Sequence, residues 1–370
     1  MPEDELTALL TLNRIEGLGC IGAKYLYEQL GSAQEIFRSR DHLKDIIPGV
    51  DPSLIEALGS SGYDSFVREE IDFIEKHGIR CVTPADTDYP ARLIDCNDAP
   101  LVLFSLGNVN YNAARTVAIV GTRKATDYGR RMCHSFIKEL HQLCPDITIV
   151  SGLAYGIDVE SHKAAVQTGV PTIGVLAHGL DMIYPSAHRE IAKAMLGDGG
   201  LVTEFMSRTI PLGPNFVRRN RIIAGLSDAV VVVESAAKSG SLITAEIAES
   251  YNRDCFAFPG SVGDPYSVGC NELIRDNHAT LITSALDFVN AMNWNECETK
   301  GRIIQKELFP ELTEEEDKVY QRVRLKAQGV HINTLITELN IPYARLSSIL
   351  FNLEMKGLVK QTPGALCKPC

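Results

Sequence analysis

Three arginines stand beside one aromatic ring in the segment FVRRNRIIAG, residues 216–225. A guanidinium group is planar and can give two parallel hydrogen bonds to a phosphate or a carboxylate, so Arg218, Arg219 and Arg221 are suited to binding an anion. The alternatives are a solvated helix face and an internal ion-pair network. We favour an external anion, because residues 209–227 contain no Asp or Glu that could be a local partner. The same helix has a predicted buried side, formed by Ile222, Ile223, Ala224 and Leu226.

Loops of small residues follow four of the five strands that the sequence predicts, and these strands must position the arginines. Apolar, β-branched runs alternate with helical stretches, which predicts a parallel sheet with strands at 116–120, 147–150, 172–176, 229–233 and 255–258. Where such a strand ends in a glycine loop before a helix, free amides and the positive helix end converge on one point, and this is how an α/β sheet builds an anion site. The sequence predicts an extended groove made by four of these loops, at 121–123, 151–156, 235–241 and 259–263.

The chain of 370 residues is long enough for two or three domains. We predict an α/β fold with a Rossmann-like, mostly parallel sheet, divided into a helical, helix-hairpin-helix-like (SAM-like) domain at 1–78, a Rossmann-like domain at 79–292, a linker at 293–312 and a winged-helix-like domain at 313–370. In the helical region, Gly17, Gly19 and Gly22 allow a tight turn, for which a structural role and a DNA-contacting role are equal alternatives.

The winged-helix-like region has three predicted short helices, at 319–325, 331–339 and 343–356, and a strand at 357–360. Its last helix, the expected recognition helix, offers only Arg345 and Lys356 as cations. Because phosphate contacts dominate DNA affinity, we favour a protein-binding or packing role over duplex DNA.

The overall composition narrows the class of partner and the compartment. The formal net charge of −11 means that any nucleic acid must be held by a local basic surface. No apolar run approaches the roughly 18 residues of a membrane span, and ten scattered cysteines fit reduced thiols, so we expect a soluble, cytoplasmic protein that does not engage membranes. Cys367 and Cys370 form a single pair, which we expect to be tail thiols rather than a zinc site.

Motifs for catalysis are absent from the sequence. It contains no Gly-x-Ser-x-Gly elbow, no His-Glu-x-x-His and no Cys/His set with metal spacing, and residues 79–292 contain no Gly-x-Gly-x-x-Gly or Walker loop. Asp158 and His162 are spaced i, i+4 and could hydrogen-bond on one helix face, where a structural contact is a commoner explanation than a catalytic dyad. We therefore expect no cofactor and no metal.

The α/β region contains an ordered series of motifs. The series is Gly121-Thr-Arg123, Ser151-Gly-Leu-Ala-Tyr-Gly-Ile-Asp158 with His162, Tyr184-Pro185 with His188, Thr203-Glu204, Phe216 to Ser227, Ser239-Gly-Ser-Leu-Ile-Thr244, and Phe258-Pro-Gly260 with Asn271 to Ile274. This series resembles the DNA-processing protein A (DprA, Smf) family. The resemblance spans essentially the whole α/β region, and the flanking regions resemble the accessory domains of the family. It implies a bacterial protein that binds single-stranded DNA and passes it to the RecA recombinase during natural transformation, as a homodimer formed through the α/β domain.

The resemblance also implies which residues bind the strand. The pocket of the family falls on Gly121, Thr122 and Arg123, and on Phe216, Arg218, Arg219 and Asn220. Lys124 extends the positive track, and the loop at Ser239, Gly240 and Ser241 adds free amides. A ring that stacks on a base, together with cations that follow the backbone, binds single strands with little regard to sequence.

The strongest rival is a nucleotide phosphoribohydrolase-like enzyme, in which Glu246 and an arginine of the 218–221 cluster would cleave an N-glycosidic bond. Such enzymes resemble Pro-Gly-Gly-x-Gly-Thr at the loop, and the segment 239–244, SGSLIT, lacks the second and third glycines. A third possibility, an adaptor that works through its terminal domains, leaves the arginines unexplained. We therefore predict a recombination mediator without catalysis.

Overall fold

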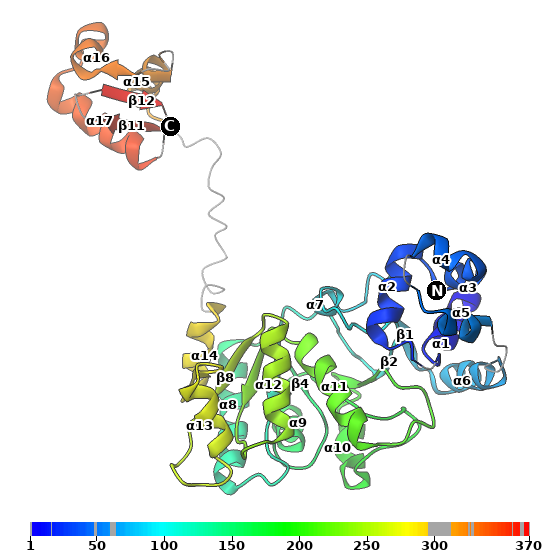
Figure 1. Ribbon diagram of the computed structural model, residues 1–370. Helices are drawn as coiled ribbons and strands as arrows, with labels where there is room; N and C mark the ends of the chain where they lie inside the picture. Colours follow the sequence, from blue (N-terminus) through cyan, green and yellow to red (C-terminus); the bar gives the residue numbers. More distant parts are fainter. Residues whose placement is uncertain are drawn as a thin grey trace. The chain divides into compact units, whose positions relative to one another are not determined.

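A computed structural model describes residues 2–15, 17–47, 50–59, 64–294, 312–324, 326, 329–356, 358–362 and 366–369. The chain forms two compact units, Met1–Asn295 and Glu296–Cys370 (Figure 1). Most of the predicted linker, residues 295–311, lies outside the described residues, as does Cys370 of the terminal cysteine pair.

The first unit begins with helices, drawn in blue in Figure 1, and within its described residues no strand precedes residue 80. The helices are α1 (Glu3–Leu12), α2 (Cys20–Leu30), α3 (Ala33–Arg38), the 3-10 turn η1 (Arg40–His42), α4 (Leu43–Ile46), α5 (Pro52–Gly59) and α6 (Asp64–His77). Their buried side chains share one core with Leu101, Val102 and Phe104 of the α/β region. The helical region is therefore anchored on the sheet, and the division at 78/79 stays a prediction.

A sheet of nine strands follows, in the order β1-β2-β6-β5-β4-β3-β7-β8-β9. The five predicted strands are all present, as β3 (Arg115–Val120), β4 (Ile147–Ser151), β5 (Thr172–Val175), β7 (Ala229–Val232) and β8 (Asp254–Ala257), and they pair in parallel. The sequence did not predict β1 (Arg80–Val82), β2 (Leu103–Gly107), β6 (Gly200–Thr203) and β9 (Thr280–Leu281). Three of these four lie at or next to the sheet edges, and only β1 and β2 add antiparallel pairing.

Helices cover both faces of this sheet, as the uninterrupted apolar strands require. Alternate residues of β3 point to opposite faces, so Val117 and Ile119 belong to one core and Ala118 and Val120 to the other. The first face is covered by α8 (Asp127–Leu143), α9 (Ile157–Thr168) and α14 (Ala285–Ala291), and the second by α7 (Ala91–Ile94), α11 (Gly213–Gly225), α12 (Gly240–Ser250) and α13 (Val268–Arg275). The short η2 (Ser186–His188) and α10 (Arg189–Ala194) precede β6. This is the predicted Rossmann-like architecture (Figure 1).

The second unit combines three helices with a small antiparallel sheet, as predicted for a winged helix. It consists of α15 (Glu314–Arg324), β10 (Val330–His331), α16 (Ile332–Leu339), α17 (Tyr343–Met355), β11 (Val359–Thr362) and β12 (Leu366–Pro369), with strand order β10-β12-β11. The first helix begins five residues before its predicted start, because Thr313 and Glu316 cap it reciprocally: each backbone N–H donates to the other's side chain, at 3.0 and 3.3 Å. No helix in the described part of the chain could cross a membrane.

Candidate functional site

A cavity of about 640 Å³ opens where the parallel strands end. Its walls come from the loops that follow β3, β4 and β7 and from the first turns of α11 and α12. Of the predicted binding residues, Lys124 and Arg218 lie outside the lining, and the others line the cavity: Gly121, Thr122, Arg123, Phe216, Arg219, Asn220, Ser239, Gly240 and Ser241. Three segments that are far apart in sequence therefore meet at one site.

The fourth predicted loop, residues 259–263, does not line this cavity, so the groove is shorter than the sequence predicted. The loop follows β8, which lies beyond β7 in the strand order of the sheet. Its backbone is already engaged, because the amide side chain of Asn271 binds both the N–H and the carbonyl of Gly260, at 3.1 Å each. This loop is a tight turn and not part of the cavity wall.

Two glycines of the loop after β4 bring the walls close together. Gly156 has a φ of +79°, and a Cβ at this position would lie 2.1 Å from the carbonyl oxygen of Thr122. A Cβ on Gly152 would lie 2.4 Å from the guanidinium of Arg219. Gly156 therefore allows this loop to contact the loop after β3, and Gly152 leaves room for the guanidinium of Arg219.

Arg219 is a buried cation at the base of the cavity, with only 4 % of its surface exposed. Its Nη1 donates to the carbonyl oxygens of Gly152 and Val175, and its Nε donates to Oδ1 of Asn220 at 3.2 Å. Within the described residues, Nη2 donates no hydrogen bond and no carboxylate forms an ion pair with the group. Burial lowers the pKa of Arg219 to about 10, partly offset by Asp158, so the side chain stays charged at neutral pH.

Two arginines lie close to the ring of Phe216. The guanidinium carbon of Arg123 is 5.2 Å from the ring centroid, and that of Arg219 is 5.9 Å away. Both distances are within the range of cation–π contact. Arg123 and Lys124 are exposed, whereas Phe216 is half-buried. The lining thus brings together an aromatic ring, the buried charge of Arg219 and the exposed charge of Arg123.

Hydroxyl groups gather at the amino end of α12, which forms another part of the cavity wall. The hydroxyls of Ser235, Ser239 and Ser241 lie 2.6–3.0 Å from one another. Asn220 fixes this loop to α11, because its Nδ2 donates to the carbonyl oxygen of Gly240 at 3.2 Å. Donor hydroxyls beside a helix amino end suit an anion with several oxygens.

The expectation that all three arginines meet an external anion is wrong for Arg221 and unsupported for Arg218. The buried carboxylate of Glu204 accepts a hydrogen bond from Arg218 at 2.8 Å and another from Arg221. Burial lowers the pKa of Arg221, but Glu204 and its other neighbours raise it above its usual value. The alternative of an internal ion-pair network therefore holds for this pair, because the partner lies beyond the 209–227 segment that the sequence argument considered.

The comparisons with known proteins identify the family. A family model described as "DNA recombination-mediator protein A" matches residues 80–293, and one described as "DprA winged helix domain" matches residues 307–365. The chain belongs to the DNA recombination-mediator protein A family. The resemblance seen in the sequence is thus confirmed, as is the fold class.

Among the family's members, Protein Smf of Synechocystis is 34 % identical over 291 residues, which are 77 % of this chain and 72 % of that protein. The DNA processing protein DprA of Streptococcus pneumoniae is 42 % identical over 55 % of this chain and 70 % of its own. Its X-ray structure has a TM-score of 0.66 and covers 77 % of this chain and 97 % of that one, at 32 % identity.

A second solved structure is that of DNA processing protein A from Helicobacter pylori, which is described by its single-stranded DNA binding mode. It has a TM-score of 0.53 at 28 % identity and covers 58 % of this chain and 97 % of that one. Both structures therefore support the fold found for this member of the family.

The carboxylates that raised the question of catalysis, Glu246 and Asp158, form no hydrogen bond or ion pair with their expected partners in the described residues. Glu246 is exposed and does not line the cavity, and within the described residues it forms no ion pair with an arginine. Asp158 and His162 do not hydrogen-bond, because His162 faces β5, where its Nδ1 lies 2.7 Å from Oγ1 of Thr172. Burial lowers the pKa of His162 to about 3, which keeps the ring neutral. No group of three potential metal ligands occurs in the described ranges.

Asp158 and Tyr184 are among the lining residues to which the sequence gave no predicted binding role. Asp158 lines the cavity as a buried carboxyl whose pKa is raised by burial, against the opposing effect of Arg219. Tyr184 lines it with an exposed ring next to Phe216. The only sequence signal for the tyrosine is its place in the Tyr-Pro pair, and nothing local in the sequence says that this pair lies beside α11.

Proposed function

We propose that this protein is a cytoplasmic recombination mediator that binds single-stranded DNA in the cavity between the β3, β4 and β7 loops. It would protect incoming strands and load the RecA recombinase on them during natural transformation, acting without catalysis. One observation carries the proposal: a base-sized aromatic ring, Phe216, lies within cation–π distance of Arg123 and Arg219 at the mouth of a glycine-lined cavity.

The parts of the site have distinct roles in this proposal. Phe216 stacks on a base, a contact worth about 1–3 kcal/mol per base, and an unpaired strand exposes the base faces that this contact needs. Arg123 and Lys124 neutralise phosphates from the rim, and Arg219 offers its Nη2 to a phosphate from below. Asn220 holds the Ser239–Ser241 loop in place. Gly121 and Thr122 let the strand approach the end of β3.

Arg218 has a lesser place in the proposal. Its side chain is 42 % exposed although it is paired with Glu204, so it could meet a phosphate only outside the main cavity. It lines a smaller cavity of about 220 Å³ beside the turn between α1 and α2. We retain it as a binding residue at the flank of the path.

A single strand is the ligand that fits this site, because positive side chains gather at the site while the formal net charge of the whole chain is −11. The Helicobacter pylori relative, whose structure is described by its single-stranded DNA binding mode, supports the same ligand class. No specific observation favours the phosphoribohydrolase alternative, since Glu246 lies outside the cavity lining.

Two remaining parts of the proposal, the homodimer through the Rossmann-like domain and the transfer to RecA, rest on the family resemblance. The division into domains at 1–78, 79–292, 293–312 and 313–370 rests on the sequence pattern. For the winged-helix domain we propose protein binding or packing. The two cations of its α17 region are engaged by α15, Arg345 with Glu315 and Lys356 with Glu316, each at 2.8 Å.

The test is the salt dependence of oligonucleotide affinity. Wild-type protein should bind dT12 more tightly than a 12-base-pair duplex, and the logarithm of the association constant should fall linearly with the logarithm of the salt concentration. The double variant Arg123→Ala with Arg219→Ala should lose most of this binding. Arg275→Ala, which removes one positive charge from an exposed pair with Asp276 outside the cavity lining, is the control. A flat salt response, or unchanged binding by the double variant, would remove the basis of the proposal.

A further inference from the structure

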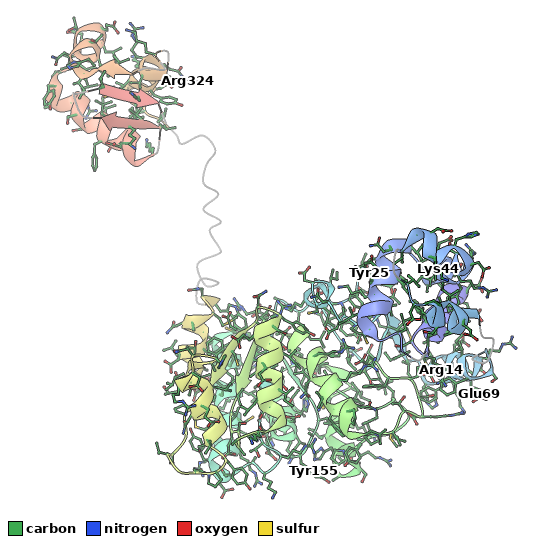
Figure 2. The ribbon with its side chains drawn as sticks, viewed as in Figure 1. Arg14, Tyr25, Lys44, Glu69, Tyr155 and Arg324 are labelled. Atoms are coloured by element: carbon green, nitrogen blue, oxygen red, sulfur yellow. The ribbon has the colours of Figure 1, made fainter. Side chains whose placement is uncertain are left out.

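Tyr184 is an exposed aromatic residue at the mouth of the cavity. Tyr184 follows β5, whereas Phe216 belongs to α11. The exposed fraction of Tyr184 is 47 %. Tyr184 lines the main cavity and also a small adjoining pocket, which it shares with Arg123, Tyr155 and Phe216. Figure 2 shows Tyr155, one of the residues that line this pocket, on the lower side of the first unit. An exposed ring that lies beside a binding cavity is available to a ligand.

The backbone of Tyr184 is held by a buried histidine. The Nδ1 of His178 is 2.8 Å from the carbonyl oxygen of Gly179, so this nitrogen carries the proton and donates. The Nε2 is then free to accept the backbone N–H of Tyr184, at 3.3 Å. The tyrosine is therefore fixed at its backbone, and binding a base there loses less conformational freedom than at a loose loop.

The separation of the two rings decides how many bases they could serve. A base placed between two parallel rings needs about 7 Å, which is two van der Waals separations of about 3.5 Å. The centroids of Tyr184 and Phe216 are 5.9 Å apart, and the ring planes are inclined by 56°. One base cannot fit between them with both faces in contact. The inclination instead suits two neighbouring bases that are splayed apart, with one base on each ring.

We propose that Tyr184 is a second base-stacking position beside Phe216, so that the site takes at least two adjacent unpaired nucleotides. This inference rests on the proposed function, and it adds the length of the recognised unit. Arg123, whose guanidinium lies over the Phe216 ring and which lines the cavities shared with Tyr184, is placed to meet the phosphate that joins the two nucleotides.

The first experiment measures the affinity for dT12. Tyr184→Ala and Phe216→Ala should each weaken binding by about 5- to 100-fold, and Tyr184→Phe should bind as wild type does. Tyr184→Leu keeps an apolar side chain of similar size but no ring, so it should lose affinity even if the alanine variant folds poorly. The matched control is Tyr25→Ala, because Tyr25 is equally exposed, at 49 %, and lies on α2 of the helical region (Figure 2).

The second experiment uses a 12-mer in which every second base is missing. Neighbouring bases can then no longer occupy both rings at once, so at least one of the two alanine variants should bind this strand as tightly as wild type does. If both variants still bind it more weakly, a single base contacts both rings, and the inference is wrong.

Two results for dT12 separate the inference from the function. If Tyr184→Ala and Tyr184→Leu match wild type while Phe216→Ala binds weakly, the second stacking position does not exist but the proposed function stands. If wild-type protein shows no salt-dependent binding of dT12, both the proposed function and the second stacking position are wrong.

Discussion

Replacing Glu204 by glutamine should destabilise the first unit strongly and leave its phosphate contacts intact. The carboxylate is 2 % exposed and its partner Arg221 is 8 % exposed, so this pair is shielded from water. Removing one partner of a buried ion pair costs about 3–5 kcal/mol, because the other charge stays buried without compensation. The half-exposed Arg218 adds little, roughly 0–1 kcal/mol for a pair of this kind.

This loss of free energy corresponds to a lower melting temperature, by about 6–20 °C at roughly 2–4 °C per kcal/mol. Thermal unfolding followed by circular dichroism measures it. The variant Arg221→Met should be compared with Glu204→Gln. It should lower the melting temperature less, because Glu204 would keep Arg218 as an ionic partner. The slope of the salt titration with dT12, measured well below the melting temperature, should be unchanged in Glu204→Gln.

Two results would refute this reasoning. A melting temperature within about 2 °C of wild type would mean that the pair is solvated in solution and that Arg221 is available to an external anion, as the sequence predicted. A salt slope that changes by a full phosphate contact, about 0.7 for a single strand, would mean that Glu204 controls a DNA-binding charge.

Three further predictions follow from other residues of the site. Arg123→Ala should lower the salt slope for dT12 by about 0.7 at nearly unchanged stability, since this exposed side chain makes no hydrogen bond within the described residues; an unchanged slope would place it off the path of the strand. Gly152→Ala should weaken DNA binding and cost about 1–3 kcal/mol in urea unfolding, because its Cβ would displace the Arg219 guanidinium, whereas Gly197→Ala, where the space is open, should do neither. The pKa of His162 is about 3 in the folded state, below its unfolded value, so protonation at low pH favours the unfolded chain. The free energy of unfolding should therefore fall by about 2 kcal/mol between pH 7.5 and pH 5, and by less in His162→Gln.

The central strands could be predicted because each is buried on both faces. Burial from helices above and below requires an uninterrupted apolar run, and β3, β4, β5, β7 and β8 all have one. The missed strand β6 is buried as well, but it begins with Gly200, where a Cβ would lie 2.2 Å from the carbonyl oxygen of Leu106. That glycine is required by the close approach of β2, a contact between distant segments that no local pattern records.

The candidate site was predictable in its components but not in their partners. Glycine loops after buried strands must meet at the carboxyl edge of a parallel sheet. The sequence alone therefore predicted that Gly121, Arg123 and the Ser239–Ser241 loop lie near one another, and the same motifs indicated the family. Three neighbouring charges in α11 looked equivalent, yet they point in different directions from the helix. Only the tertiary structure decided that Arg221 turns inward to Glu204, that Arg219 lies beneath the cavity, and that Tyr184 joins Phe216 at its mouth. The physical reason is that a side chain's ionic or stacking partner is set by which distant segments the sheet order brings together, and spacing along the chain carries no record of that order.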